Sequence, residues 1–209
     1  VAQMNDNLGD AEGWYRKSRD IMEAVGNRRG MAESYHQLGI VAQMNDNLGD
    51  AETWCRKSRD IREALGDRPG MASSCHQLGM VAQMRGDGDA AETWYRKSLQ
   101  INEALGDRPG LAMTYGQLGK LALTKGDPHT GLTWIVRSVT LFDAFPHPST
   151  QWSPQNLAVF TRHLGWDALA AAWSNATGQP LPDHVRDWIS ARIAEMDTED
   201  TATDADSST

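Results

Sequence analysis

The feature that most constrains this chain is a 40-residue period that runs through its first 120 residues. Residues 1–40 and 41–80 differ at only nine positions, and residues 81–120 keep the same frame. A degraded fourth copy follows, in which Gly126 and Trp134 stand 40 residues after their counterparts. Self-similarity at such a period is typical of proteins built from stacked units, none of which can bury its apolar face alone.

Each unit contains two segments with helical periodicity. Residues 71–84 place apolar or small side chains three and four positions apart, and residues 51–65 do the same around Trp54 and Cys55. We call the first kind of segment the A helix and the second the B helix. The Gly-Asp-Arg-Pro-Gly sequences at 66–70 and 106–110 are expected to close the B helices, because glycine suits a helix C-terminus and proline cannot extend a helix.

These patterns predict an all-α fold, an antiparallel helix-pair solenoid with a non-repeat helical cap at its C-terminal end. The repeats are expected over residues 1–145, with the first unit lacking its A helix. Three capping helices are expected within 146–196, because proline and glycine divide that stretch into three apolar segments. Residues 197–209 are acidic and lack large apolar side chains, so we expect a disordered tail there.

The spacing of the large and small residues resembles the tetratricopeptide repeat family. That family's pattern is a large residue, then Leu-Gly, then Ala and an aromatic residue; here it is matched by Cys75, Leu78, Gly79, Ala91 and Tyr95, and similarly in the copies beside it. The 40-residue unit exceeds the family's usual length of about 34 residues. In this it resembles the repeats of kinesin light chains and of bacterial regulators that join such arrays to nucleotide-binding or caspase-like domains.

The resemblance implies that the A helices line a concave face that holds a protein or peptide. Glutamine and histidine can hydrogen-bond an extended backbone, and Ile40 and Met80 offer apolar contacts. Only Lys120 is cationic on this face, so the lysine and arginine clamp of chaperone-binding members is missing. The expected partner-binding residues are His36, Gln37, Ile40, Gln43, His76, Gln77, Met80, Gln83, Gln117 and Lys120.

The resemblance therefore favours a protein-binding or peptide-binding scaffold, within a larger bacterial regulatory protein. The alternative is a structural spacer or oligomerisation module whose concave face holds no ligand. Neither reading makes the chain an enzyme.

Signals for catalysis, cofactors or metals are weak. The Gly-Asp-Arg-Pro-Gly sequences lack the preceding strand and the Lys-Ser/Thr of a phosphate-binding loop. His36 and His76 occupy equivalent positions, but the next copy has Gly116 there, and two histidines are too few ligands for a metal site. We expect no cofactor and no metal.

Composition and charge argue against nucleic acid and membranes as partners. The net charge is −8, and five of the acidic residues lie in 197–209, so nothing attracts the phosphates of nucleic acid. No apolar run reaches the length of a membrane span. Cys55 and Cys75 fall at core positions and suit free thiols in a reducing compartment, which favours a cytoplasmic protein.

Two further expectations concern the aromatic residues. Tryptophan recurs once per unit on the B helices, and an aromatic stripe at this spacing is usually core. The first B helix lacks an A helix to cover it, since Val1 corresponds to the last turn of an A helix. We therefore expect a weak homodimer through the uncovered residues Trp14, Tyr15, Ile21 and Val25.

Overall fold

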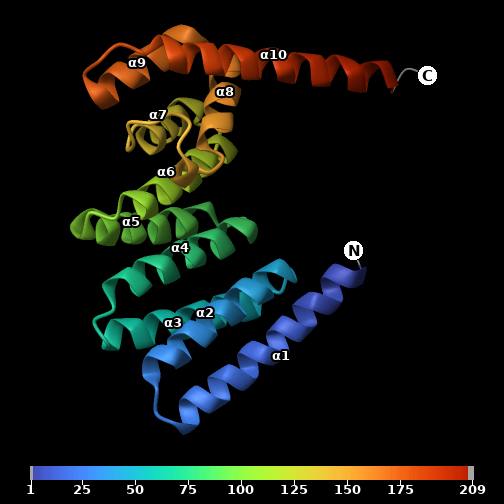
Figure 1. Ribbon diagram of the computed structural model, residues 1–209, viewed down its shortest axis with the longest axis vertical. Helices are drawn as coiled ribbons and strands as arrows, with labels where there is room; N and C mark the ends of the chain where they lie inside the picture. Colours follow the sequence, from blue (N-terminus) through green and yellow to red (C-terminus); the bar gives the residue numbers. More distant parts are fainter. Residues whose placement is uncertain (1, 207–209) are drawn as a thin grey trace. The chain divides into compact units, whose positions relative to one another are not determined.

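The computed structural model describes residues 2–206, with side chains for residues 8–200, and its regular structure over this range is entirely helical (Figure 1). In chain order the helices are α1 (Ala2–Ala24), α2 (Arg28–Met44), α3 (Leu48–Ala64), α4 (Arg68–Met84), α5 (Gly88–Leu105), α6 (Arg108–Thr124), α7 (Pro128–Val139), the 3-10 helix η1 (Pro148–Thr150), α8 (Ser153–Leu164), α9 (Trp166–Thr177) and α10 (Asp183–Asp206). The predicted all-α helix-pair solenoid is confirmed.

The turns between the repeat helices recur every 20 residues and share one construction. A residue in the left-handed conformation ends each helix, and the next residue caps the following helix. At one such turn Gly86 has φ 79° and the Asp87 carboxylate accepts a hydrogen bond from the Ala90 amide at 3.0 Å. Glycine adopts this conformation without strain, and aspartate satisfies an amide that the helix leaves free. The left-handed residues are Gly26, Asp46, Gly66, Gly86, Gly106 and Gly126.

The Gly-Asp-Arg-Pro-Gly sequences interrupt the helices over fewer residues than we expected. Gly66 ends the turn after α3, but Asp67 already caps α4, and Pro69 lies in the first turn of that helix. Proline is tolerated there because its missing N–H would have no helical partner. The A helices therefore begin three residues earlier than the sequence analysis placed them.

The chain forms two compact units, unit 1 (Val1–Gly110) and unit 2 (Leu111–Thr209), which we describe separately. This division differs from the expected boundary at residue 145. The reason lies in α7, whose Leu132 and Ile135 share one core with Phe160 of α8, Leu169 of α9 and Ile189 of α10. The fourth repeat is thus part of the same apolar cluster as the capping helices.

Within unit 1, each of α1 to α4 packs against the next helix in the chain. Leu38 and Leu78 are almost completely buried, as predicted. Serine hydroxyls fix the B helix of a pair to its A helix: Ser58 donates to the Ala32 carbonyl at 2.8 Å, and Ser98 donates to the equivalent carbonyl of α4 at 2.9 Å. The two pairs α2–α3 and α4–α5 therefore share one packing scheme.

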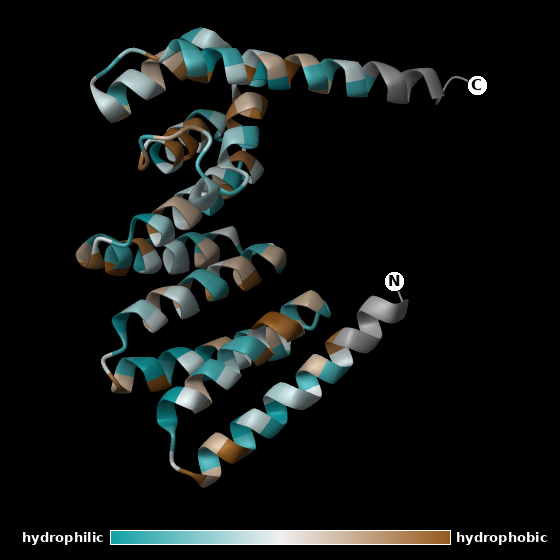
Figure 2. Cartoon of the chain, in the orientation of Figure 1, coloured by the Kyte–Doolittle hydropathy of each residue, from teal (hydrophilic) through white to brown (hydrophobic). Residues whose placement is uncertain are grey.

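Unit 2 contains the α6–α7 pair and three further helices. Ser138 repeats the serine bond of unit 1, donating to the Ala112 carbonyl at 2.8 Å. Figure 2 shows brown apolar residues in α7 among paler and teal ones, in keeping with the part of this helix that lies in the unit's core. The last helix, α10, continues to Asp206, so residues 197–206 are helical where we expected disorder. Arg162 of α8 pairs with Asp197 and Asp200 of α10 at 2.8 Å each, which stabilises that extension.

The first helix differs from the expectation for a truncated repeat. We expected Val1 to lie in the last turn of an A helix, with the first B helix after it. Val1 lies outside the described residues, and α1 is continuous from Ala2 to Ala24. Over the described range, no helix has both the length and the apolar character that spanning a bilayer requires.

Candidate functional site

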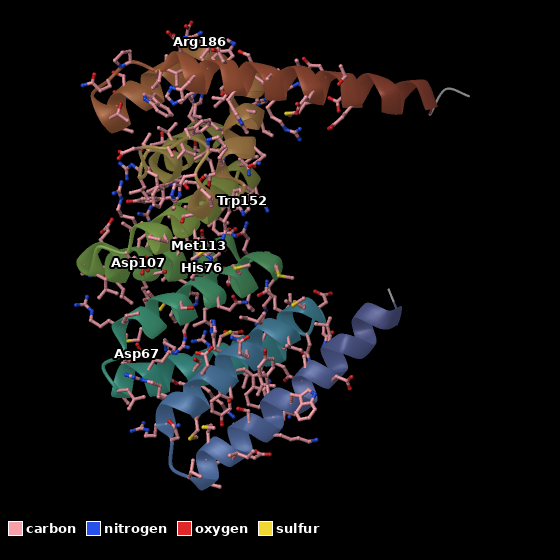
Figure 3. All side chains as sticks on the ribbon, viewed as in Figure 1. Asp67, His76, Asp107, Met113, Trp152 and Arg186 are labelled. Atoms are coloured by element: carbon pink, nitrogen blue, oxygen red, sulfur yellow. The ribbon has the colours of Figure 1, made fainter. Side chains whose placement is uncertain are left out.

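The expected binding residues of unit 1 lie on α2 and α4, two A helices that contact each other. Three neighbouring side chains that the sequence analysis did not select belong to the same surface, because contacts or repeat equivalence join them to it. We call this surface the α2–α4 wall; Figure 3 labels His76 within it. It consists of His36, Gln37, Ile40, Gln43, Met44, Ser73, His76, Gln77, Met80, Gln83 and Met84.

Gln43 joins the two helices of the wall. Its side-chain carbonyl accepts a hydrogen bond from the amide of Gln77, and its own amide nitrogen lies 3.1 Å from the Met84 sulfur. Gln77 is only 8% exposed, whereas Met84 is 49% exposed. The buried glutamine therefore orients Gln43, and Gln43 in turn contacts a thioether that is open to solvent.

His36 of α2 makes a second side-chain contact with α4. It is only 9% exposed, and its Nε2 lies 3.4 Å from Ser73 Oγ on α4. Nδ1 of the same ring has no hydrogen-bond partner within the described part of the chain. Burial, reinforced by the nearby charge of Arg62, lowers the pKa of His36 to about 4. The ring is therefore neutral at pH 7, and its unpaired nitrogen is buried and not open to a ligand.

His76 occupies the equivalent position on α4 in a different environment. Its ring packs against Tyr95 of α5, with 5.5 Å between the ring centroids. Burial, with a smaller effect from His36, lowers the pKa of His76 to about 4. The Tyr95 hydroxyl donates to Gln83 Oε1 at 2.8 Å, and burial raises the pKa of this tyrosine. A buried ring thus orients Gln83 and leaves its amide nitrogen for other partners.

Glycine permits this close packing of α5 against α4. A Cβ atom added to Gly79 would lie 2.5 Å from the Tyr95 ring, so no larger residue fits without displacing that ring. In the preceding pair, a Cβ atom at Gly39 would meet the Cys55 sulfur instead. The Leu-Gly pair therefore has the close-packing role that its place in the repeat suggested.

A buried arginine at one edge of the wall escaped the sequence analysis. Arg62 of α3 donates to the Gly70 carbonyl at 2.9 Å and to the Glu33 carboxylate at 2.7 Å. It therefore neutralises the one acidic side chain beside the wall on α2. The signal that could have revealed it is the repeat itself, because the neighbouring units carry Met22 and Asn102 at this position.

The two expected binding residues of unit 2 have a different environment. Gln117 is half-buried on α6, and Lys120 is exposed with its Nζ 4.9 Å from the centre of the Trp152 ring. At Gly116, the counterpart of His36 and His76, an added Cβ atom would lie 3.0 Å from the Ser153 hydroxyl. The start of α8 thus lies against α6 at Gly116, where unit 1 has histidines.

The tryptophan stripe is not core, contrary to expectation. Trp14 is 69% exposed, and Trp54, Trp94 and Trp134 are half-buried. Their rings make cation–π contacts: the Nζ atom of Lys97 lies 4.4 Å from the Trp94 centroid, and similar contacts recur along the B helices. An indole combines an apolar body with a face that attracts cations, so it is stable at this half-exposed position.

Beside Trp94 lies a cavity of about 460 Å³, bounded by α3, α4 and α5. Leu78, Val81 and Ala82 contribute apolar surface, whereas Arg56 and Arg85 both bind the Glu52 carboxylate. The charged groups here neutralise one another. This hollow is therefore distinct in character from the uncharged α2–α4 wall.

The cysteines and the α1 surface lie where the sequence placed them. Cys55 and Cys75 are free and buried. Burial raises the pKa of Cys55 to about 12 and also raises that of Cys75, so neither thiol is activated. On α1, Trp14 and Ile21 are exposed and Tyr15 is half-buried, and Val25, just after this helix, is exposed. Among the residues with described side chains, no three histidine, cysteine or carboxylate groups are placed to hold a metal ion.

Comparison with known proteins places this geometry in context. Tetratricopeptide repeat family models match residues 70–139 and residues 31–68, which together make up over half of the chain. No curated protein matches the sequence.

Solved structures with this fold share little sequence with the chain. BtubC (BKLC) from P. vanneervenii is 16% identical with a TM-score of 0.69, over 93% of this chain and 76% of that one. A putative kinesin light chain from Podosopora anserina with nearly identical TPR-like repeats is 16% identical with a TM-score of 0.64, over 93% and 90%. MamA is 17% identical with a TM-score of 0.56, over 84% and 92%. At these identities the likeness concerns the fold alone.

Proposed function

We propose that this chain, which belongs to the tetratricopeptide repeat family, holds an extended segment of a partner protein against the α2–α4 wall. Repeats of this family serve in general as protein-interaction scaffolds, and their A helices line the concave face. The proposal gives the chain no catalytic role. A cytoplasmic location and membership of a larger bacterial regulator remain predictions from the sequence.

The observation that carries the proposal is the hydrogen-bonding state of the wall. Gln43 and Gln83 are each oriented by a neighbouring side chain, yet each can still donate to a ligand, Gln83 through its amide nitrogen and Gln43 through its second amide N–H. Oriented amides suit the alternating N–H and C=O groups of an extended backbone. Because these groups are already ordered, binding costs little side-chain entropy.

The test uses peptides selected from a displayed random library on the immobilised chain. Met84→Glu places a charge on an exposed part of the wall, and Gln100→Glu adds the same charge at an exposed position of α5 away from it. We expect Met84→Glu to weaken binding about tenfold or more in calorimetry and Gln100→Glu to leave it unchanged. Equal affinity of wild type and Met84→Glu would show that the wall is not the binding surface.

A second candidate function, self-association, is favoured by the exposure of α1. Trp14 and Ile21 are 69% and 58% exposed, which is unusual for large apolar side chains on one helix. In a two-fold dimer Trp14→Glu would act twice. Sedimentation at high concentration should show a weak dimer for wild type and for Gln100→Glu, but a monomer for Trp14→Glu. A wild-type chain that stays monomeric contradicts this function.

A further inference from the structure

We infer that the segment bound by the α2–α4 wall is uncharged where it contacts these helices, with amide or hydroxyl side chains at one end and aliphatic ones at the other. This inference rests on the proposed function and specifies its partner. It is argued from the distribution of charge and of exposed side chains in unit 1.

The wall has almost no charge of its own. Residues 71–84 contain no Asp, Glu, Lys or Arg, and among these four types residues 30–44 contain only Glu33, which Arg62 engages at 2.7 Å. Arg85, the residue after Met84, is bound to Glu52 on α3. A carboxylate or ammonium group brought against the wall would lose water and gain no counter-ion, which is costly.

The two histidines do not supply the missing charge. His36 is buried and His76 is half-buried, and burial of the rings lowers the pKa of each to about 4. Both rings are therefore neutral at physiological pH and give an anionic side chain no ion pair.

The polar and apolar parts of the wall lie at different ends. Ser73 is exposed beside the buried His36, so this end offers a hydroxyl. At the C-terminal ends of α2 and α4, Met44 is 59% exposed and Met84 is 49% exposed. Flexible, polarisable thioethers adapt to aliphatic groups of varied shape. The wall therefore favours a polar uncharged side chain beside Ser73 and an aliphatic one beside the methionines.

The B helices of the same unit provide the contrast. Arg56, Lys57 and Arg59 of α3 and Lys97 of α5 lie over the rings of the tryptophan stripe. Cations and carboxylates are thus concentrated and paired on the B helices, whereas the wall carries amides and methionines. A charged partner segment would find opposite charges on the B helices and none on the wall.

The experiment compares peptide pools selected by wild type, Ser73→Lys and Thr93→Lys. Ser73 and Thr93 are both exposed, the first on the wall and the second on α5, so both variants should fold. We expect the wild-type and Thr93→Lys pools to be depleted of Asp, Glu, Lys and Arg relative to the starting library. The Ser73→Lys pool should instead be enriched in Asp and Glu, because the wall then carries an unpaired cation.

The outcomes separate this inference from the proposed function. Selected wild-type peptides that are rich in charge, yet lose about tenfold or more in affinity on Met84→Glu, would overturn the inference and leave the function standing. Peptides that bind wild type and Met84→Glu equally, or a library that yields no binder, would overturn the function itself. Uncharged peptides that require the wall, with an acidic pool on Ser73→Lys, support both.

Discussion

The neighbouring helix pairs α2–α3 and α4–α5 carry the same two residue types in exchanged places. The first pair has Tyr35 on its A helix and Cys55 on its B helix, whereas the second has Cys75 and Tyr95. Tyr35 is half-buried and stacks on Trp54, with centroids 5.5 Å apart, whereas Tyr95 is completely buried. The tyrosine ring therefore lies at the surface of the first helix pair and in the core of the second.

This exchange changes how the wall is supported. Where the B helix carries tyrosine, its hydroxyl orients Gln83 from behind. Where it carries Cys55, no hydroxyl is present, and Gln43 is oriented by Gln77 of the next A helix. Repeats of one fold can thus differ in the source of the hydrogen bonds that order their binding surface.

Of the changes that test this comparison, loss of the buried Tyr95 ring should have the largest effect on stability. Tyr95→Cys should lower the free energy of unfolding by about 3–5 kcal/mol, because it leaves a cavity in the α4–α5 pair. The matched change Tyr35→Cys removes a half-exposed ring and should cost about 1 kcal/mol. Urea unfolding followed by circular dichroism measures both. Equal losses would show that the two tyrosines are not packed differently.

The next effect concerns the glycines that approach these residues. Gly79→Ala forces a methyl group against a buried ring and should cost about 1–3 kcal/mol. Gly39→Ala meets chiefly the Cys55 sulfur, with two backbone atoms at 3.4 Å, and should cost less because no ring has to move. A double-mutant cycle with Cys55→Ala should remove most of the Gly39→Ala penalty. An undiminished penalty in that background would place the clash elsewhere.

The histidines give the fold a pH dependence on the acidic side. Because the pKa of His36 and of His76 is lowered from 6.5 to about 4, the unfolded chain takes up protons before the folded chain does. Stability is therefore complete above pH 6.5 and declines as the pH falls toward 4, by about 1–3 kcal/mol for each histidine. Urea midpoints across this range should fall less steeply in His36→Asn and His76→Asn. An unchanged slope in both variants would contradict the burial of neutral rings.

The smallest effect lies in the turns that join the two helices of each pair. Asp46 has φ 57°, where the equivalent turn has Gly86 with φ 79°. Asp46→Gly should raise the free energy of unfolding by about 0.5–1 kcal/mol, and Gly86→Asp should lower it by a similar amount. Thermal unfolding monitors both changes. A loss of stability in Asp46→Gly would mean that the Asp46 side chain stabilises the turn more than its backbone strains it.

The repeat period predicted most of the fold because it fixes which residues must be small. Leu78 and Gly79, read from the sequence as the site of close packing, contact Tyr95 and its helix as expected. The same reasoning misjudged Trp94, since periodicity marks an apolar face without showing how much of it neighbours cover. The cations that accompany the stripe come partly from the preceding B helix, and one-dimensional spacing does not show that contact.

Other features could not be predicted from the sequence, because identical segments adopt different structures. Residues 2–12 repeat residues 42–52 exactly, yet the first stretch is continuous helix and the second contains the turn at Asp46. Local propensity is the same in both, so the tertiary surroundings decide. Likewise, the hydrogen bond from Gln77 to Gln43 links residues 34 positions apart in the chain, and no pattern within one unit could show it.

The wall itself can be tested directly by methyl resonances of the methionines. A chain labelled at its methionine methyl groups would be titrated with a peptide selected on wild type. Binding to the α2–α4 wall predicts shifts at Met44, Met80 and Met84, with Met113 and Met196 unchanged. Saturation by the peptide with these three resonances unmoved would contradict the central claim that the wall holds the partner.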